Sequence, residues 1–130
     1  MPYGIGTVLD LTAAEAEIRV REALAAEGFG VLTEIDVTAT MKAKLDVDVA
    51  PYRILGACNP PLAHRALQAD PDIGLLLPCN VVVYESAEGT VVAALEPNLM
   101  AQMSSSPELA AIAAEARARL VRVIEAVEAG

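Results

Sequence analysis

The chain has 130 residues, of which 55% are hydrophobic and only 3% aromatic. A chain of this length can bury a core as one domain, so we expect a single domain over residues 1–130. Acidic residues outnumber basic ones 18 to 9, which gives a net charge of −9. A surface this acidic repels phosphate groups, so we expect no nucleic acid and no anionic membrane surface as partner.

The sequence favours a cytoplasmic location. Its first residues show neither the basic segment nor the apolar segment of a secretory signal. No apolar run approaches the roughly 20 residues that a membrane-spanning helix needs. The two cysteines are therefore expected to be reduced thiols rather than a structural disulfide.

In the first half of the chain, hydrophobic periodicity predicts a strand over residues 3–11, a helix over 13–27, a strand over 29–37 and a short helix over 39–45. Thr12 and Glu15 have the spacing of a capping box at the start of the first helix. Gly28 is placed to end that helix in the left-handed conformation. Val31, Thr33, Ile35 and Val37 are expected on one strand face, and Leu32, Glu34 and Asp36 on the other, where the acidic pair faces solvent. Thr38 is the expected cap of the short helix that follows.

In the second half, the pattern predicts a strand over 52–58, a helix from Asn59 to residue 69, strands over 79–85 and 90–96 joined by a hairpin, a helical turn over 98–103 and a long last helix from residue 107. Ser106, Pro107 and Glu108 form a typical start for that helix. Its apolar residues follow the helical period at Leu109, Ile112, Ala113, Ala116, Leu120, Val123, Ile124 and Val127.

These elements predict an α+β fold with a largely antiparallel sheet of about five strands and helices packed mainly on one face. Ile54 and Leu55, like Val82 and Val83, are apolar neighbours that point to opposite sides of the sheet. Both faces are therefore apolar, and helices in so short a chain readily cover one of them. We expect a partner subunit to cover the other, in a homodimer; a doubly covered monomer is the alternative.

The repeated dipeptides Cys58-Asn59 and Cys79-Asn80 are the concentrated chemical feature of the chain. Cys58 ends one predicted strand and Cys79 begins the next, so antiparallel pairing would bring both thiols to one edge of the sheet. His64 follows in the helix after Cys58. Thiolates and imidazole bind zinc or copper, which makes Cys58, His64 and Cys79 a candidate metal site. Met100 or Met103 could add a thioether ligand for copper(I).

The two asparagines differ in how readily structure explains them. Asn59 suits the N-cap of the following helix. Asn80 lies inside a predicted strand, where asparagine is disfavoured and, if buried, needs several hydrogen-bond partners. It would brace the loop after Cys58 or face a ligand. The resulting candidate site for a small ligand or cofactor of unknown identity comprises Cys58, Asn59, Cys79 and Asn80.

Two other functions stay open. Cys58 and His64 could form the dyad of a thiol enzyme or redox protein, with Asn59 or Asn80 as orienting or oxyanion group. The protein could equally be a structural or partner-binding dimer whose cysteines are simply buried, as free cysteines usually are. A small binding module, holding a metal or other ligand at the Cys58/Cys79 end of the sheet, is the interpretation we favour.

Two segments carry a resemblance to a known family. PYRILGACNPPLAH (residues 51–64) and LLLPCNVVVY (residues 75–84), together with residues 28–37 and 41–45, resemble the domain-of-unknown-function 302 family of bacteria and archaea. The resemblance implies a compact α+β fold with an antiparallel sheet, often found as a dimer, and no assigned activity. The residues that match the Cys-Asn motifs of that family are Cys58, Asn59, Pro60, Pro78, Cys79 and Asn80.

Overall fold

The structure is a computed structural model that describes residues 3–130. Its five strands form one sheet in the order β1-β5-β4-β3-β2, with every neighbouring pair antiparallel. The strands are β1 (Gly4–Leu9), β2 (Gly30–Asp36), β3 (Tyr52–Cys58), β4 (Cys79–Ser86) and β5 (Gly89–Leu95). The α+β fold class and the antiparallel sheet predicted from the sequence are confirmed.

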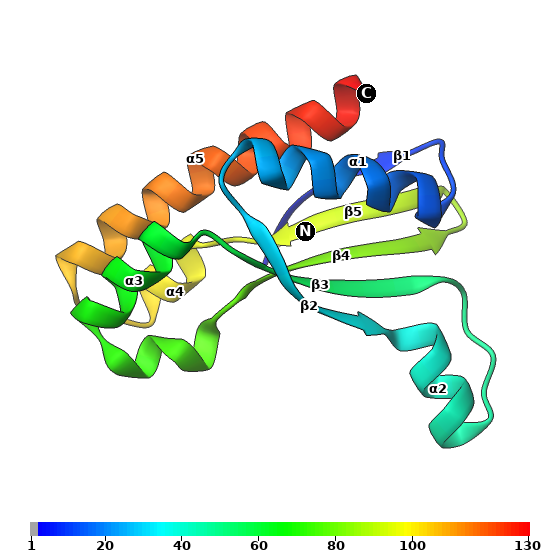
Figure 1. Cartoon of the computed structure of the whole chain (residues 1–130), viewed down its shortest axis with the longest axis horizontal. Coiled ribbons are helices and arrows are strands. Elements are labelled where there is room, and N and C mark those ends of the chain that lie inside the picture. The colour runs from blue at the N-terminus through cyan, green and yellow to red at the C-terminus, as the bar shows by residue number, and fades with distance from the viewer. Residues whose placement is uncertain (1–2) are drawn as a thin grey trace.

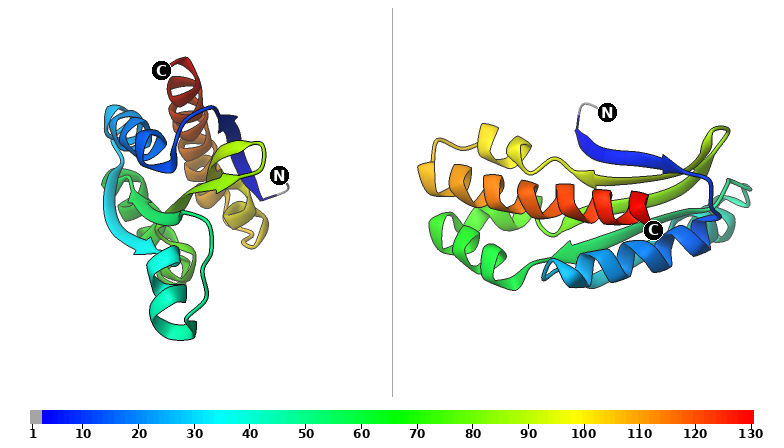
Figure 2. Two further views of the ribbon diagram at one scale, coloured as in Figure 1. Left: turned by 90° about the vertical axis from the view of Figure 1, so that its right-hand side faces the viewer. Right: turned by 90° about the horizontal axis from the view of Figure 1, so that it is seen from above.

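The helices are α1 (Ala13–Ala26), α2 (Val37–Leu45), α3 (Pro60–Ala69), the 3-10 helix η1 (Pro71–Leu76), α4 (Asn98–Gln102) and α5 (Pro107–Ala129). Helices α1 and α5 pack side by side over one face of the sheet, which we call the covered face (Figures 1 and 2). Helices α3, α4 and η1 gather beyond one end of the strands with the first half of α5 (Figure 1).

Helix α5 buries the whole apolar stripe that its sequence predicts. All eight residues of that stripe are buried in the structure. Leu120 and Val127 at 0% exposure belong to the main core with α1 and the sheet, whereas Leu109 and Ile112 pack with α3 and η1. None of the helices within residues 3–130 combines the length and the apolar character that crossing a membrane requires.

Both predicted ends of α1 are confirmed. Thr12 accepts a hydrogen bond from the amide of Glu15, and the Glu15 carboxylate accepts one from the amide of Thr12, which completes the capping box. After the helix, Gly28 has a φ of 83°, the left-handed conformation that a side chain disfavours. The turn at Gly28 sends the chain back along the sheet as β2.

Two local predictions were wrong. Helix α2 begins at Val37 and is capped by Asp36, whose carboxylate accepts from the amide of Ala39. Thr38, which the sequence suggested as the cap, instead donates to the carbonyl oxygen of Ala50 and accepts from the amide of Tyr52. These bonds tie the loop after α2 to the start of β3.

The second correction concerns β2. A bulge between Val31 and Thr33 shifts its pairing with β3, so Val31 stands opposite Ala57 and Thr33 opposite Gly56. An inserted residue changes the side to which the chain points. Val31 therefore packs against the core, whereas Thr33 lies against Gly56 on the other face. The two residues do not share a face as the plain alternation predicted.

Among residues 3–130, no helix lies over the second face of the sheet, which we call the uncovered face (Figure 2). Helix α2 projects away from the body of the chain and buries none of its residues (Figure 1). The uncovered face therefore remains open to solvent or to a partner.

Candidate functional site

The two cysteines come together at one end of the sheet. Strands β3 and β4 pair antiparallel with Ala57 opposite Cys79, so Cys58 lies one residue further along the neighbouring strand. Both thiols are free; Cys79 is buried and Cys58 is half-buried. The arrangement expected from the strand order is therefore present, and no disulfide joins the pair.

Both cysteines are among the residues that line a cavity of about 40 Å³ between the end of the sheet and the helices beyond it. Four helical elements border it, namely α3, η1, α4 and α5. Its walls are mostly hydrocarbon and comprise Phe29, Ala57, Cys58, Asn59, Leu62, Ala63, Ala66, Ile73, Leu77, Pro78, Cys79, Met100, Leu109, Ile112, Ala113 and Ala116. The sequence could not show this cavity, because it is formed by segments that lie far apart along the chain.

Burial changes the chemistry of one thiol. Loss of solvent contact, together with the nearby charge of Cys58, raises the pKa of Cys79 to about 11. Burial has this effect because an apolar environment disfavours the charged thiolate. Cys79 is therefore a neutral thiol at physiological pH.

Asn59 is buried, and its side-chain amide joins two helices. Its Oδ1 accepts a hydrogen bond from the amide of Leu62 at 3.3 Å, which confirms the predicted N-cap of α3. Its Nδ2 donates to the carbonyl oxygen of Glu27 at 3.3 Å, at the C-terminal end of α1. Arg119 donates to the same carbonyl oxygen at 3.0 Å. Both ends of the amide are thus hydrogen-bonded within the fold, although Asn59 also lines the cavity.

Asn80 is placed quite differently. It is exposed and stands opposite Gly56, with its side chain on the uncovered face and away from the cysteine cavity. Because Asn80 is exposed, solvent can satisfy its amide, and it does not need the buried hydrogen-bond partners that the sequence suggested. The candidate ligand set of Cys58, Asn59, Cys79 and Asn80 is therefore divided, with only the first three residues at the cavity.

His64 lies outside the cavity. It is exposed on α3 and is not among the lining residues. Within residues 3–130, no three His, Cys, Asp or Glu side chains gather in a way that could hold a metal ion. Met100 from α4 lines the cavity, whereas Met103 is 74% exposed. The sulfur atoms at this end of the molecule thus come from Cys58, Cys79 and Met100.

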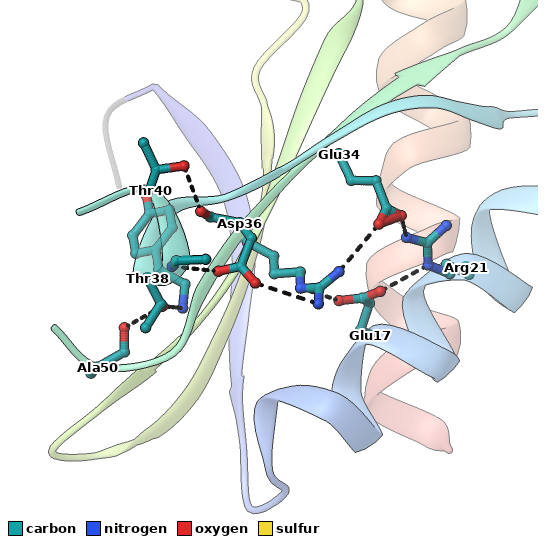
Figure 3. Close-up of polar contacts among 10 residues, drawn as sticks. Glu17, Arg21, Glu34, Asp36, Thr38, Thr40 and Ala50 are labelled. Atoms are coloured by element: carbon teal, nitrogen blue, oxygen red, sulfur yellow. Dashed lines mark hydrogen bonds and ion pairs between the residues drawn. The ribbon is translucent and has the colours of Figure 1, made fainter. Parts of the chain in front are cut away.

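A second polar cluster lies at the opposite end of the sheet (Figure 3). Arg53 on β3 contacts carboxylates of Glu17, Glu34 and Asp36, and Arg21 pairs with Glu17 and Glu34. The sequence suggested that Glu34 and Asp36 form a solvated strand face. Instead, they form ion pairs that link β2 to α1 and β3. The strand register places Asp36 opposite Arg53, and the sequence alone does not show this register.

The uncovered face carries a shallow groove of about 540 Å³. The rings of Tyr52 and Tyr84, from neighbouring strands, stack within it with centroids 4.9 Å apart. Asn80 and Val82 line the same groove. This groove carries an aromatic pair, whereas the walls of the cavity at the end of the sheet are mostly aliphatic.

Comparison with known proteins places the chain in a recognisable group. The family model described as "Domain of unknown function DUF302" matches residues 5–127. The chain is also similar to a solved structure described as the crystal structure of an uncharacterized conserved protein DUF302 from Bacillus stearothermophilus. The two share 31% sequence identity over 97% of this chain and 98% of that one, with a TM-score of 0.89. No curated protein matches the sequence.

Proposed function

We propose that this chain, which belongs to the DUF302 family, is a small binding module that takes a ligand into the cavity at the Cys58/Cys79 end of the sheet. The observation that carries the proposal is that both cysteines are lining residues of one mostly apolar cavity at the end of the sheet. Pockets with mostly apolar walls and few polar groups are where proteins usually hold small molecules.

The cavity limits the size and polarity of its ligand. An engineered cavity of about 150 Å³ is large enough for benzene, so the 40 Å³ here suits a ligand of only a few heavy atoms. The amide of Asn59 is already hydrogen-bonded at both ends, and the other lining groups are hydrocarbon or sulfur. The site therefore selects a ligand that prefers sulfur and hydrocarbon to water.

Binding is better supported than catalysis. A thiol enzyme needs a base within hydrogen-bond reach of its nucleophile. His64, the one histidine of the chain, is exposed and outside the cavity. The thiols of the cavity have no imidazole beside them, which leaves a thiol enzyme based on Cys58 as the weaker alternative.

Xenon is a direct probe of the cavity, because it enters dry apolar spaces. We expect backbone amide NMR shifts under xenon pressure to concentrate at lining residues such as Phe29, Leu62 and Ile112. Ala113→Val should abolish them, since Ala113 lines the cavity and is 2% exposed. Ala118→Val, at an exposed position of the same helix, is the matched control. Equal shifts in wild type and Ala113→Val would contradict the proposal.

We also propose that two copies pair through the uncovered face, in the cytoplasm where both thiols stay reduced. A chain with a charge of −9 repels its copies across most surfaces. The side chains that point to this face are uncharged and include the stacked aromatic pair, a type of residue that often anchors interfaces. The strand residues with side chains on this face include Val8, Thr33, Ile35, Tyr52, Ile54, Asn80, Val82, Tyr84, Val91, Ala93 and Leu95.

Molar mass in solution tests the dimer. We expect a dimer at micromolar concentration for the wild type and a monomer for Val82→Lys, because a lysine in the centre of the face would bury an unpaired charge. Ile18→Lys is the control, since Ile18 is 61% exposed on α1 and lies outside the face. A monomeric wild type would refute the dimer and leave the cavity proposal untouched.

A further inference from the structure

The two outer strands of the sheet differ in how their free edges are protected. Strand β2 has the bulge between Val31 and Thr33, and its acidic side chains form ion pairs with Arg21 and Arg53. Bulges and charged side chains are the usual devices that keep an edge strand from pairing with another chain. Strand β1 pairs with β5 without a shift of register, and it contains no charged residue and no proline. It forms the other border of the sheet (Figure 2).

The hydrogen bonds to β5 determine which backbone groups of β1 point away from the sheet. The amide of Glu96 donates to the carbonyl oxygen of Tyr3 at 3.0 Å, so these two residues form a hydrogen-bonded pair. Hydrogen-bonded pairs alternate with non-bonded pairs along an antiparallel ladder. The amide and carbonyl groups of Gly4, Gly6 and Val8 therefore point outward. Within the described residues β5 is the one strand beside β1, and we call these outward groups the free edge.

An added strand would meet little obstruction at the free edge. Val8 is 49% exposed, and Gly6 is exposed as well. Glycine in a strand often marks a place where another backbone approaches closely, because it has no side chain. Both Gly4 and Gly6 belong to the outward set. The free edge therefore offers unpaired N–H and C=O groups of the kind that extended peptides bind when they add a strand to a sheet.

The surroundings of β1 are acidic. Asp10 directly follows the strand, and the carboxylate of Glu128 accepts a hydrogen bond from Oγ1 of Thr7 at 3.1 Å. Among the ion pairs of residues 3–130, none includes Asp10 or Glu128. Asp10 also lines a hollow of about 380 Å³ together with Glu15 and Glu85. Uncompensated carboxylates attract cationic groups, so the charge beside β1 favours a basic partner.

Strand direction decides which end of such a partner is basic. Antiparallel strand pairs outnumber parallel pairs in proteins. Strand β1 runs from Gly4 to Leu9, so an antiparallel peptide begins beside Leu9 and ends beside Gly4. The α-amino group and the first side chains of the peptide then lie nearest to Asp10, the residue after Leu9. Basic residues are therefore favoured at the N-terminal end of the peptide.

We propose that the free edge of β1 is a docking site for an extended peptide with a basic N-terminal end, which adds antiparallel to β1 as a new outer strand. Backbone hydrogen bonds to Gly4, Gly6 and Val8 supply affinity, and Asp10 selects the charge and direction of the peptide. None of these residues lines the cysteine cavity, so the docking site is independent of a ligand there.

Two synthetic peptides, the basic KKVTVTV and the acidic EEVTVTV, test the docking site by NMR of the isotope-labelled full chain. We expect KKVTVTV to shift the amide signals of Gly4, Gly6 and Val8 and to slow their hydrogen exchange. The acidic peptide should bind about tenfold more weakly. Asp10→Asn should weaken KKVTVTV about threefold, whereas Asp72→Asn, at an exposed position of η1, should not. Equal affinity for both peptides, or shifts confined to other strands, would overturn the proposal.

Val8→Pro and Val8→Thr are a matched pair of variants, because only proline removes the outward amide. Proline is tolerated in an edge strand where its nitrogen faces solvent. We expect Val8→Pro to bind KKVTVTV about tenfold more weakly than Val8→Thr, since one backbone hydrogen bond is lost. Equal affinities would contradict strand addition. If Val8→Pro alone changes the molar mass in solution, a second copy occupies the free edge and the peptide assignment is wrong. Thermal unfolding without peptide checks the fold of each variant, and the Asp10→Asn comparison decides if Val8→Pro unfolds.

Discussion

Cys58-Asn59 and Cys79-Asn80 are the same dipeptide, yet the structure gives the two asparagines opposite roles. Asn59 is 7% exposed and hydrogen-bonds two helices, whereas Asn80 is exposed on the uncovered face. The cysteines differ in the reverse sense, since Cys79 is buried and Cys58 half-buried. The difference arises because the first pair ends a strand, where the chain turns into a helix, and the second begins one, where side chains alternate between faces.

The two copies of the Cys-Asn motif therefore do not form two equivalent sites. Cys58, Asn59 and Cys79 line one cavity, and Asn80 does not. The two asparagines lie on opposite sides of the sheet. Asn59 caps a helix, and Asn80 faces solvent or a second copy. Four substitution experiments test this difference between the two Cys-Asn pairs.

The largest expected effect concerns the thiols at high pH. Cys79 has a folded-state pKa of about 11, compared with 9.0 for an unperturbed thiol. Between these values the unfolded chain has lost a proton that the folded chain keeps, so stability falls as pH rises. Two pKa units correspond to a loss of about 2–3 kcal/mol, which is absent below pH 8, is mostly present at pH 11 and is complete only above pH 11.

Urea unfolding at pH 8 and pH 11 measures this loss. The other groups that titrate in this range affect wild type and variants alike, so the difference isolates Cys79. Cys79→Ala should lose about 2–3 kcal/mol less than the wild type over that range. Cys58→Ala should retain most of the wild-type loss, because burial, rather than the charge of Cys58, is the larger cause of the raised pKa. Identical losses in all three proteins would contradict the burial of Cys79.

The next largest effect on stability is expected at Gly56, which lies beside the exposed Asn80. Gly56 stands opposite Asn80, and a Cβ added there would clash with Oγ1 of Thr33 and lie 2.9 Å from Cγ of Pro78. Gly56→Ala should therefore destabilise the protein by about 2 kcal/mol. Thr33→Ala removes one of the two clashes and should recover part of the loss in the double variant. A Gly56→Ala protein as stable as the wild type would show that the strand spacing yields easily.

The two asparagines give a matched pair of substitutions. Asn59→Ala removes an N-cap and a bond to the Glu27 carbonyl, and should cost about 1–2 kcal/mol. Asn80→Ala removes an exposed side chain and should change stability by less than about 0.5 kcal/mol. Urea unfolding at neutral pH, below the association range, compares them. Equal losses would mean that Asn80 has a structural role that the fold does not reveal.

The sequence predicted the fold well wherever local signals determine it. The capping box at Thr12, the turn at Gly28, the cap at Asn59 and the α5 stripe depend on neighbouring residues or on a helical period, and all are confirmed. The bulge at β2 was missed because nothing in an alternating strand marks an inserted residue. Asp36 was missed as the cap of α2 because Thr38 offers an equally good capping side chain two residues later.

The candidate site was predictable only in part. Strand order alone brings Cys58 and Cys79 together, because an antiparallel pair places the end of one strand beside the start of the next. The direction of each side chain was not predictable, and it decides that Asn80 and His64 lie elsewhere. The cavity itself needs α3, η1, α4 and α5 in their final places, which no local pattern encodes.

The smallest expected effect is the coupling energy between Asn59 and Arg119, which tests the structural role of the buried Asn59. Asn59 and Arg119 donate to the same Glu27 carbonyl oxygen, so each should partly compensate for loss of the other. A double-mutant cycle of Asn59→Ala and Arg119→Met should show a coupling of about 0.5–1 kcal/mol, because an acceptor left with neither donor loses both bonds at once. Asn59→Ala combined with Arg53→Met is the control, since Arg53 lies in the ion-pair cluster at the far end of β3 and should add independently. Zero coupling in the first cycle would mean that the carbonyl is satisfied by solvent, and that Asn59 serves α3 alone.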